Sequence, residues 1–414
     1  MKLILEKLNF KWHEVKALKI VVQKFGGTSV SSEEKRNKLV EKVKRAISQG
    51  YNPIVVVSAM GRKGDNYATD TLLSLIDEKF KKNNKQATDL LISCGEIISS
   101  VVVTNELVNA GIKAIPLTGG QAGIITDDVF QDATYETVDN RNLIEILNEG
   151  SVPVVTGFQG VTKKGYVTTL GRGGSDTSAA IIGSAVNADK IEIYTDVDGI
   201  MTADPRIVKN ASVINVLNYD EVFQLADQGA KVIHPKSIEI AKQHNIPVYI
   251  KNTMNDTEGT IINSVGDKAN KKLVTSITSC GDRMQVIIKL DENKENLNYN
   301  KTLDIIADNN ISLDFINIFP EEQIFTISKE DSDKLSRLFN NLKIKYHIKD
   351  NCCKVAIVGS GMRGIPGVMA KIYRTLQENN IEVLQTADSH MTIWCLIEDK
   401  QLEKAVNALH KAFI

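Results

Sequence analysis

Val167-Thr-Thr-Leu-Gly-Arg-Gly-Gly-Ser-Asp-Thr-Ser-Ala-Ala-Ile181 is the stretch from which the fold and chemistry of this 414-residue chain can be worked out. Residues 166–170 predict a short strand, and the apolar end of the stretch predicts a helix. The three glycines between them allow the backbone to approach a ligand closely and leave amide groups free. The helix start, with Ser175 as its expected N-cap, is typical of an anion site. Arg172 adds a guanidinium suited to a carboxylate or phosphate, and Asp176 adds a negative charge in the first turn.

The next part of the chain repeats this design in Ile193-Tyr-Thr-Asp-Val-Asp-Gly-Ile-Met-Thr-Ala-Asp-Pro-Arg206. Residues 190–194 predict a strand, 195–199 a polar turn, and 202–206 a second polar loop that ends in a guanidinium. Both loops are rich in groups that bind anions and cations. We therefore expect a nucleoside triphosphate with its metal, held outside the carboxyl ends of parallel strands.

Composition and charge narrow the class of protein. The length predicts two to three domains, and 42% apolar with 24% charged residues is ordinary for a soluble globular chain. A net charge of -1 argues against nucleic acid or a membrane surface as a partner. The five cysteines form no CxxC and no metal spacing, which indicates a reducing compartment. Residues 1–18 lack a signal-peptide core, and no apolar run approaches the roughly 18 residues of a membrane span, so we expect a cytosolic protein.

A glycine turn also follows the strand predicted at 20–24, in Phe25-Gly-Gly-Thr-Ser-Val30, before a helix predicted at 32–49. It is not a Walker A loop, because no Gly-Lys-Ser/Thr ends it. Lys24 is placed to neutralise a phosphoryl group, with the Gly26 and Gly27 amides on its oxygens. A tight structural turn explains the same glycines equally well.

Two further residues have open interpretations. Glu96 lies in an apolar part of a helix predicted at 87–109, where it is either a solvated residue or a ligand for an ammonium group. Lys231 is a candidate second cation for phosphates, whereas His234, just before Pro235, is expected to pack at a helix start. The alternation of strands and helices through about residue 255 predicts an α/β fold with a mainly parallel open sheet sandwiched by helices.

The last third of the chain contains a repeat. Residues 305–313 and 376–384 both read as a helix end, an Asn-Asn cap and a strand, with Asn310 and Asn380 separated by 70 positions. This period predicts two βαββαβ units. The second unit also has a glycine loop at 359–361 before Ile365-Pro-Gly367, which we interpret as a pocket for a small amino acid or its carboxylate.

Nearly everything after residue 18 resembles the aspartate kinases, amino-acid kinases that carry C-terminal ACT domains. Seven motifs in this order carry the resemblance, namely Lys24-Phe-Gly-Gly-Thr-Ser-Val30, Val56-Val-Ser-Ala-Met60, Ser93-Cys-Gly-Glu96, Leu170-Gly-Arg-Gly-Gly-Ser-Asp176, Tyr194-Thr-Asp-Val-Asp-Gly199, Thr202-Ala-Asp-Pro-Arg206 and Gly229-Ala-Lys-Val232. The resemblance implies an amino-acid kinase fold with two ferredoxin-like ACT units. We expect an N-terminal extension at 1–18, a catalytic domain at 19–260, and ACT units at 270–345 and 346–414, which are often interleaved in this family.

The resemblance also implies the reaction: ATP with Mg²⁺ phosphorylates the β-carboxylate of L-aspartate to 4-phospho-L-aspartate, the first step towards lysine, threonine, methionine and diaminopimelate. That carboxylate is already ionised near neutral pH, so no general base is needed. The implied substrate residues are Thr69, Glu96, Arg172, Gly173, Gly174 and Ser175. The implied nucleotide residues are Lys24, Gly26, Gly27, Ser58, Thr195, Asp196, Met201, Arg206, Lys231 and Val232. Lys24, Lys231 and Asp176 are the expected catalytic residues, with Asp176 orienting the lysines, and no metal site is expected beyond the Mg²⁺ that travels with ATP.

The ACT pair implies regulation by an amino acid and a homodimer or higher oligomer. The effector residues expected in the second unit are Met362, Ile365, Pro366, Gly367, Asp388 and Ser389. Residues 385–390 replace the family's Ser-Thr-Ser-Glu segment and look closer to the diaminopimelate-sensitive branch, which leaves lysine and threonine open. Another amino-acid kinase, such as a glutamate 5-kinase, and a non-catalytic sensor are the alternatives. The ACT pair disfavours the first, and the presence of Lys24, Asp176 and Arg172 disfavours the second.

Overall fold

The computed structural model describes residues 18–227, 232–267, 273–293, 296, 298–362 and 364–414. The chain divides into two compact units. Unit 1 comprises the residues up to Asp196 together with Ile246–Val248, and unit 2 comprises Val197–Asn245 and Tyr249–Ile414. The N-terminal extension, apart from Leu18, and Lys231 lie outside the described residues.

Unit 1 is built on five parallel strands in the order β9-β1-β2-β6-β3. The β-branched runs of β1, β2, β6 and β9 are buried, as expected for a parallel sheet covered on both faces, whereas the edge strand β3 is partly exposed. The bounds are β1 Ile20–Phe25, β2 Asn52–Val57, β3 Ala114–Leu117, β6 Val152–Thr156 and β9 Lys190–Thr195. The predicted mainly parallel sheet is confirmed.

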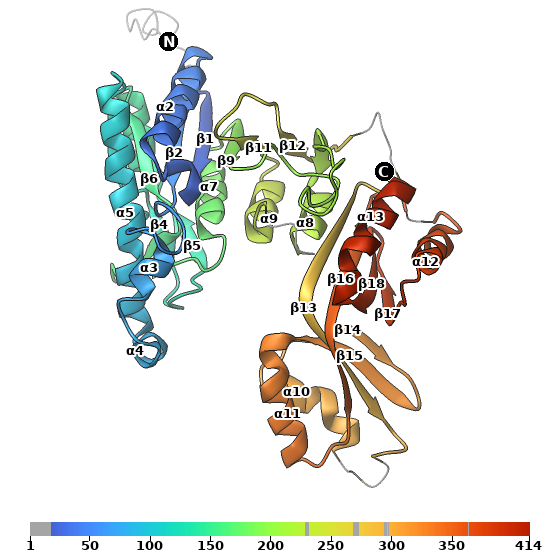
Figure 1. The fold of residues 1–414 in the computed structure, drawn as a ribbon. Coiled ribbons are helices and arrows are strands. Elements are labelled where there is room, and N and C mark those ends of the chain that lie inside the picture. Colours follow the sequence, from blue (N-terminus) through green and yellow to red (C-terminus); the bar gives the residue numbers. More distant parts are fainter. Residues whose placement is uncertain (1–17, 228–231, 268–272, 294–295, 297, 363) are drawn as a thin grey trace, which may run out of the picture. The chain divides into compact units, whose positions relative to one another are not determined.

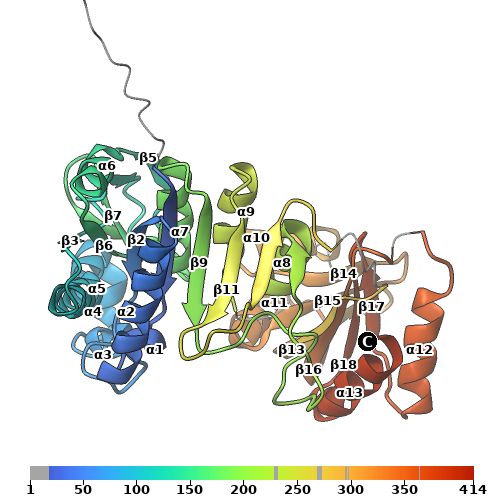
Figure 2. The ribbon, with the colours of Figure 1, turned by 90° about the horizontal axis from the view of Figure 1, so that it is seen from above.

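Helices cover both faces of these strands (Figures 1 and 2). The amphipathic helix α2 (Glu33–Ser48) and α5 (Lys85–Asn109) pack on one face, where Leu39 and Val103 meet Val55 in a single apolar core. On the other face, α7 (Gly174–Ala185) packs against β1, β2 and β9. Alternate side chains of each strand therefore enter different layers, which is the period of two that a strand imposes.

The strand register brings four loops to one edge of the sheet. Phe25 is paired with Val57 on one side and with Tyr194 on the other, and Val57 is paired in turn with Thr156. Because parallel strands that end in register deliver their following loops to the same edge, the residues after each of these positions are neighbours.

Unit 1 also contains a small sheet in the order β5-β4-β7-β8, whose last strand leads into α7. Its strands are β4 Ile124–Thr126, β5 Tyr135–Val138, β7 Gln159–Thr162 and β8 Val167–Thr169. Only β8 was predicted, because strands this short carry little periodic signal. The remaining helices are α1 Gly27–Val30, α3 Thr69–Leu73, α4 Glu78–Asn83 and α6 Arg141–Asn148.

Helix α5 corrects one expectation about membrane spans. By length and composition alone it is long and apolar enough to cross a membrane, contrary to the expectation that no segment comes near this limit. Half of its most apolar window is buried inside unit 1. The core helix of a soluble protein meets the same criteria, so this helix is weak evidence for a membrane span.

Unit 2 begins with three short strands in the order β10-β12-β11, and helices α8 and α9 pack against each other beside them. The bounds are β10 Val216–Asn218, α8 Tyr219–Asp227, α9 Pro235–Gln243, β11 Val248–Asn252 and β12 Thr260–Asn263, with Val248 itself assigned to unit 1. His234 is the N-cap of α9, and its Nδ1 accepts a hydrogen bond from the Lys236 amide. This contact agrees with the packing role expected for His234.

The rest of unit 2 is a six-stranded antiparallel sheet in the order β14-β15-β13-β16-β18-β17. The strands are β13 Ser276–Lys289, β14 Asp314–Ile318, β15 Glu322–Ser328, β16 His347–Val358, β17 Gln385–Asp388 and β18 Thr392–Glu398, and the α-helices are α10 Thr302–Asp308, α11 Ser332–Asn341, α12 Val368–Glu378 and α13 Leu402–Phe413. Short 3₁₀ turns at Tyr299–Lys301, Lys329–Asp331 and Asp399–Gln401 precede α10, α11 and α13.

The structure reproduces the internal repeat. Asn310 and Asn380 both have a left-handed backbone, with φ of 50° and 52°, just after the ends of α10 and α12. Asparagine tolerates this conformation better than most residues, which explains the repeated Asn-Asn signal.

The long strands β13 and β16 run through two separate cores (Figure 1). The second half of β13, around Val286, packs with β15, α10 and α11 in one core. Its first half, at Ile277, packs with residues of β16, β18, α12 and α13 in the other core, to which Ala203 and Val208 from residues 201–211 also belong.

Candidate active site

A cavity of about 950 Å³ lies in unit 1, where the loops after β1 and β2 meet the start of α7. Ten of the residues predicted for the site line this cavity: Lys24, Gly27, Ser58, Thr69, Glu96, Arg172, Gly173, Gly174, Ser175 and Asp176. These residues come from five separate segments of the sequence. The strand register described above brings Lys24, Gly27 and Ser58 together, and α3, α5 and the start of α7 supply the others.

The start of α7 differs by two residues from the prediction. Gly173 is the N-cap, with a left-handed φ of 68°, and the helix begins at Gly174, so Ser175 lies inside the first turn and is not the cap. A left-handed N-cap favours glycine, and the cap without a side chain leaves the first amides open. Asp176 lies in the same turn, as expected.

Lys24 and Asp176 form an ion pair at the cavity wall. Lys24 Nζ lies 2.6 Å from Asp176 Oδ1, and each side chain is 12% exposed. Strand β1 supplies the lysine and α7 supplies the aspartate. The ion pair therefore holds the Lys24 ammonium group beside the first turn of α7.

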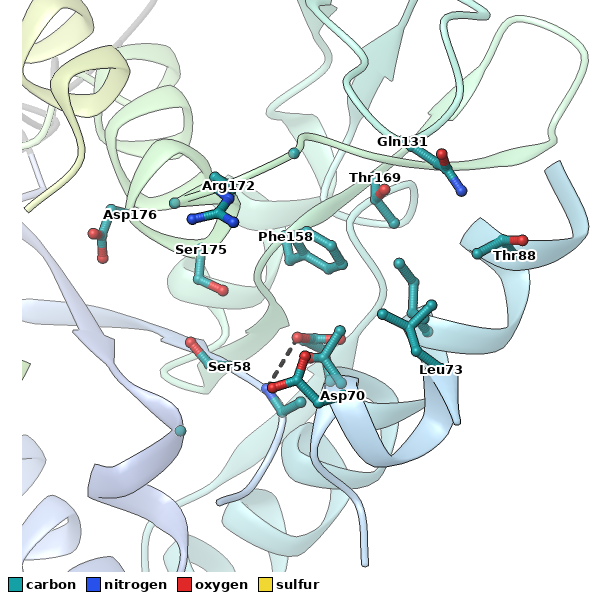
Figure 3. Close-up of a pocket in the computed structure, with 18 of the residues that line it drawn as sticks. Ser58, Asp70, Leu73, Thr88, Gln131, Phe158, Thr169, Arg172, Ser175 and Asp176 are labelled. Carbon is teal, nitrogen blue, oxygen red and sulfur yellow. Dashed lines mark hydrogen bonds between the residues drawn. The ribbon is translucent and has the colours of Figure 1, made fainter. Parts of the chain in front are cut away.

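Glu96 is a buried acid at the floor of the cavity. It is 2% exposed, its Oε1 accepts a hydrogen bond of 3.0 Å from the Ala59 amide, and its Oε2 has no partner among the described residues (Figure 3, dashed line). Burial raises the pKa of Glu96 to about 8. The solvated interpretation is excluded, and the residue is neutral at pH 7 unless a cation comes to it.

The labelled lining residues lie at two ends of the cavity. In Figure 3, Arg172, Ser175 and Asp176 lie together at one end, and Thr88 and Leu73 lie at the other. An exposed guanidinium and a buried acid within one cavity can bind the two charged ends of a zwitterion.

The sequence analysis missed several lining residues, among them Asp70, Thr88, Gln131, Phe158 and Thr169. Phe158 has a left-handed φ of 70°, which is uncommon for an aromatic residue and fits its place between β6 and β7. Its position between Gly157 and a Gln-Gly pair was a signal for a special turn. Gln131 and Thr88 gave no sequence signal.

Three further predicted nucleotide residues belong to unit 1 but do not line the described cavity. The Gly26 amide donates to the Tyr194 carbonyl (3.2 Å), which joins the β1 turn to the end of β9. Thr195 and Asp196 follow directly, and Asp196 pairs with Arg62 at 2.6 Å on the exposed surface. The β1 turn and the loop after β9 are therefore adjacent.

The other nucleotide residues lie in unit 2. Met201 forms an isolated bridge with Val213, Arg206 pairs with Asp204 at 2.6 Å, and Val232 is half-buried. Hydrogen bonding to Arg206 lowers the pKa of Asp204. Lys231 lies outside the described residues.

The expected effector residues lie in the second half of the antiparallel sheet and its turns. Met362 is buried in the core with α12 and α13, whereas Ile365, Pro366, Gly367, Asp388 and Ser389 are exposed. Within the described ranges, no group of three or more His, Cys, Asp or Glu side chains could hold a metal ion.

Family models and known relatives match most of this chain. A model of the amino acid kinase family matches residues 19–252, and a model of the ACT domain matches residues 347–411. Aspartokinase 1 of Bacillus subtilis is 44% identical over 401 residues, which is 96% of this chain and 99% of the relative.

Two solved structures of Escherichia coli aspartokinase III are similar over nearly the whole chain. The complex with aspartate and ADP, in the R-state, has a TM-score of 0.75 at 25% identity and covers 95% of this chain and 99% of that one. The complex with lysine and aspartate, in the T-state, has a TM-score of 0.73 at 25% identity and covers 96% and 100%.

Proposed function

The chain belongs to the aspartokinases, within the amino acid kinase family, and on this premise we propose that it transfers the γ-phosphoryl group of ATP to the β-carboxylate of L-aspartate. The product is 4-phospho-L-aspartate. The observation that carries the proposal is the buried acid Glu96, one of whose oxygens has no partner among the described residues, in the same cavity as Arg172 and Lys24.

The substrate is held by its two charged ends. Glu96 accepts the α-ammonium group, which supplies the missing partner of Oε2 and favours the ionised form of this acid. Arg172 binds the α-carboxylate, with Gly173, Gly174, Ser175 and Thr69 around it. This arrangement directs the β-carboxylate towards Lys24, where no general base is needed because the nucleophile is already an anion.

The phosphoryl group is stabilised by fixed charge. Lys24 neutralises its oxygens, and Asp176 orients the Lys24 ammonium through the 2.6 Å ion pair. The proposed nucleotide contacts are Gly26, Gly27, Ser58, Thr195, Asp196, Met201, Arg206, Lys231 and Val232, with Lys231 as a second catalytic cation. Mg²⁺ would arrive on the ATP phosphates, where it neutralises charge, since the described residues include no cluster to hold it alone.

Regulation is the second part of the proposal. We place the first ACT unit as an insertion in the second, since β13 and β16 pass through both cores. An amino-acid effector (lysine, threonine or diaminopimelate) acts on these units, with Ile365, Pro366, Gly367, Asp388, Ser389 and the buried Met362 as candidate contacts. The enzyme works in the cytoplasm as a homodimer or higher oligomer, at the first step towards those amino acids.

A hydroxamate assay with ATP, Mg²⁺ and L-aspartate tests the reaction directly. We expect aspartate-dependent acyl phosphate that hydroxylamine traps, and suppression by one of the three effectors. Product with L-glutamate and none with L-aspartate would favour a glutamate kinase. No product with either substrate would favour a non-catalytic sensor.

A further inference from the structure

A second cavity, of about 600 Å³, lies entirely within unit 2. Ser360 and Gly361, from the glycine loop that the sequence singled out as a pocket, form part of its wall. The other walls include Thr202, residues 212–216 and Thr275, just before β13. The cavity thus lies where the segment after residue 201 packs on the core that contains Ile277, α12 and α13.

The charge of the described lining has one sign. Among the described residues that line this cavity, Glu221 and Asp267 are charged, and none is a lysine, arginine or histidine. Glu221 is 6% exposed, so its carboxylate acts in a poorly solvated wall. A cleft lined by one sign of charge concentrates ligands of the other sign.

Glu221 has structural partners and still has free acceptor capacity. Its Oε2 accepts from the Asn218 amide at 3.1 Å, and its own amide donates to Asn218 Oδ1, which makes a capping box for α8. Its Oε1 accepts from Thr275 Oγ1 at 2.9 Å. An ionised carboxylate offers about four acceptor positions, so two of these bonds leave room for a ligand donor.

The glycine loop offers the opposite kind of group. Among the described residues, the amides of Ser360 and Gly361 donate to no acceptor. Adjacent open amides in a turn form a concavity that suits an anion such as a carboxylate. The hydroxyls of Thr202, Ser212 and Ser360 add neutral polar contacts.

The size of the cavity separates an organic ligand from an ion. A volume of about 600 Å³ lies within the range of small-molecule sites, roughly 300–1,000 Å³. No metal-binding cluster of three or more acidic, His or Cys residues occurs in the part of the chain that the structure describes.

We propose that this cavity binds a free amino acid, with its ammonium group on Glu221 and its carboxylate at the amides of Ser360 and Gly361. The site is distinct from the active-site cavity and from the exposed turns at 365–367 and 388–389. A ligand held there would join the 202–216 segment to the second ACT core. The proposal concerns binding, and it stands or falls independently of the reaction proposed above.

Isothermal titration of the full-length protein with L-lysine, L-threonine and meso-diaminopimelate tests the site. We expect at least one of them to bind, and Glu221→Gln to weaken that binding at least about tenfold, as loss of a charge-assisted bond predicts. Glutamine keeps the capping box, so the variant removes charge and keeps the fold. Ser360→Trp, at an exposed wall position, should block the same binding by filling the cavity.

Two control variants assign the binding to this cavity. Arg172→Ala alters the active site and should leave the binding intact. Asp388→Asn alters the exposed turn proposed above as an effector contact, so it should affect at most a separate binding event and leave intact the one that depends on Glu221. Loss of binding in either control, with retention in Glu221→Gln and Ser360→Trp, would place the amino acid elsewhere and overturn the proposal. The proposal is also overturned if none of the three amino acids binds at concentrations up to about 10 mM. It is overturned as well if KCl or MgCl₂, and no amino acid, stabilises the protein and Glu221→Gln abolishes that stabilisation.

Discussion

At the scale of single residues, Glu96 is an acid whose burial disfavours its ionised form. Its ordinary pKa is 4.5, and burial raises it to about 8 in the folded protein. Between these values the folded protein keeps a proton that the unfolded chain has lost, so the free energy of unfolding falls as the pH rises from about 4.5 to 8. The protein without ligand thus loses stability above pH 4.5 because of this acid, and in our proposal the ammonium group of the substrate compensates the loss.

Glu96→Gln should remove this pH dependence. We expect the Tm of the variant, measured without ligands, to rise relative to that of the native protein between pH 5 and pH 8, while its KM for aspartate increases. Thermal unfolding at several pH values measures the difference. Glu106→Gln on the same helix removes a carboxylate paired with Arg36 and should raise the Tm at no pH. If the difference in Tm between Glu96→Gln and the native protein stayed the same from pH 5 to pH 8, the pKa of Glu96 would not be raised by burial.

Substitutions of Lys24 and Arg172 should affect different kinetic parameters. Lys24→Ala should lower kcat by roughly 10²–10³, the usual loss for one transition-state donor, with a much smaller effect on the KM for aspartate. Arg172→Ala should chiefly raise that KM, by about 10- to 100-fold, for a charge-assisted pair of about 1.5–3 kcal/mol.

Steady-state kinetics with each substrate varied in turn make this comparison, and Lys82→Ala is the matched control. Lys82 also lines the cavity but is exposed at its rim, so we expect small changes in both parameters. If Arg172→Ala altered only the KM for ATP, the substrate would be misplaced in our proposal.

At the scale of elements, the site depends on how closely α5 approaches the loop after β2. A methyl group at Gly95 would lie 2.7 Å from Ala59 Cβ and 2.9 Å from the Tyr67 carbonyl oxygen. Both distances are too short, so the helix or the loop must move. Ala59 is also the residue whose amide holds Glu96, which makes this contact part of the site.

Gly95→Ala should therefore destabilise the protein, although alanine is the better helix former by about 1 kcal/mol. Overpacking typically costs about 1–3 kcal/mol, and here it should also raise the KM for aspartate by disturbing the Ala59–Glu96 bond. Cys94→Ala, on the exposed side of the same turn, should change stability by less than about 0.5 kcal/mol. Chemical denaturation of both variants measures the difference. If Gly95→Ala left the free energy of unfolding unchanged, α5 and the loop after β2 could move apart at no cost.

The elements also show what the sequence could and could not reveal. Long β-branched runs such as β2, and helices with a clear apolar stripe such as α2, were predicted because their periodicity is strong. The three-residue strands β4 and β8 have almost no period, and only β8, which precedes a glycine loop, was found.

The site divides in a similar way. Arg172 and Asp176 were found because a glycine loop at a helix start has a sequence signal, whereas Thr88 and Gln131 enter the cavity through tertiary packing alone. The length of α5 was predicted to within two residues, whereas the burial of Glu96 inside it depends on the whole of unit 1. A single sequence carries no local mark for such contacts.

At the scale of the whole molecule, catalytic and regulatory sequence are fused in unit 2. Ala203 and Val208, which lie in the region matched by the kinase family model, are buried in the core that contains α12 and α13 of the second half. The Ile277 amide donates to the Thr202 carbonyl at 2.9 Å, and Thr202 Oγ1 is hydrogen-bonded to His410 Nε2 at the same distance. The core around Val286 and Phe325 shares none of these residues.

The two halves of the regulatory region should consequently differ in what their removal does. Truncation after residue 265 exposes Ala203, Val208 and their neighbours, and we expect an insoluble product or one without cooperative unfolding. Replacing residues 283–351 by a two-residue Asn-Gly turn removes the other core and leaves the shared core complete. The replacement removes Asp314 and Phe315 as well, which accept hydrogen bonds from Lys354 and Gln385. It also rejoins β13 and β16 where they are already paired antiparallel, as at Cys280 and Lys354.

This second variant should stay soluble and unfold in a cooperative transition, as followed by circular dichroism, because the core that holds residues 203–208 remains complete. A well-folded 1–265 fragment would show instead that the shared core contributes little to the stability of the catalytic region. If the internal deletion failed and the truncation succeeded, the division of unit 2 into two independent cores would be wrong.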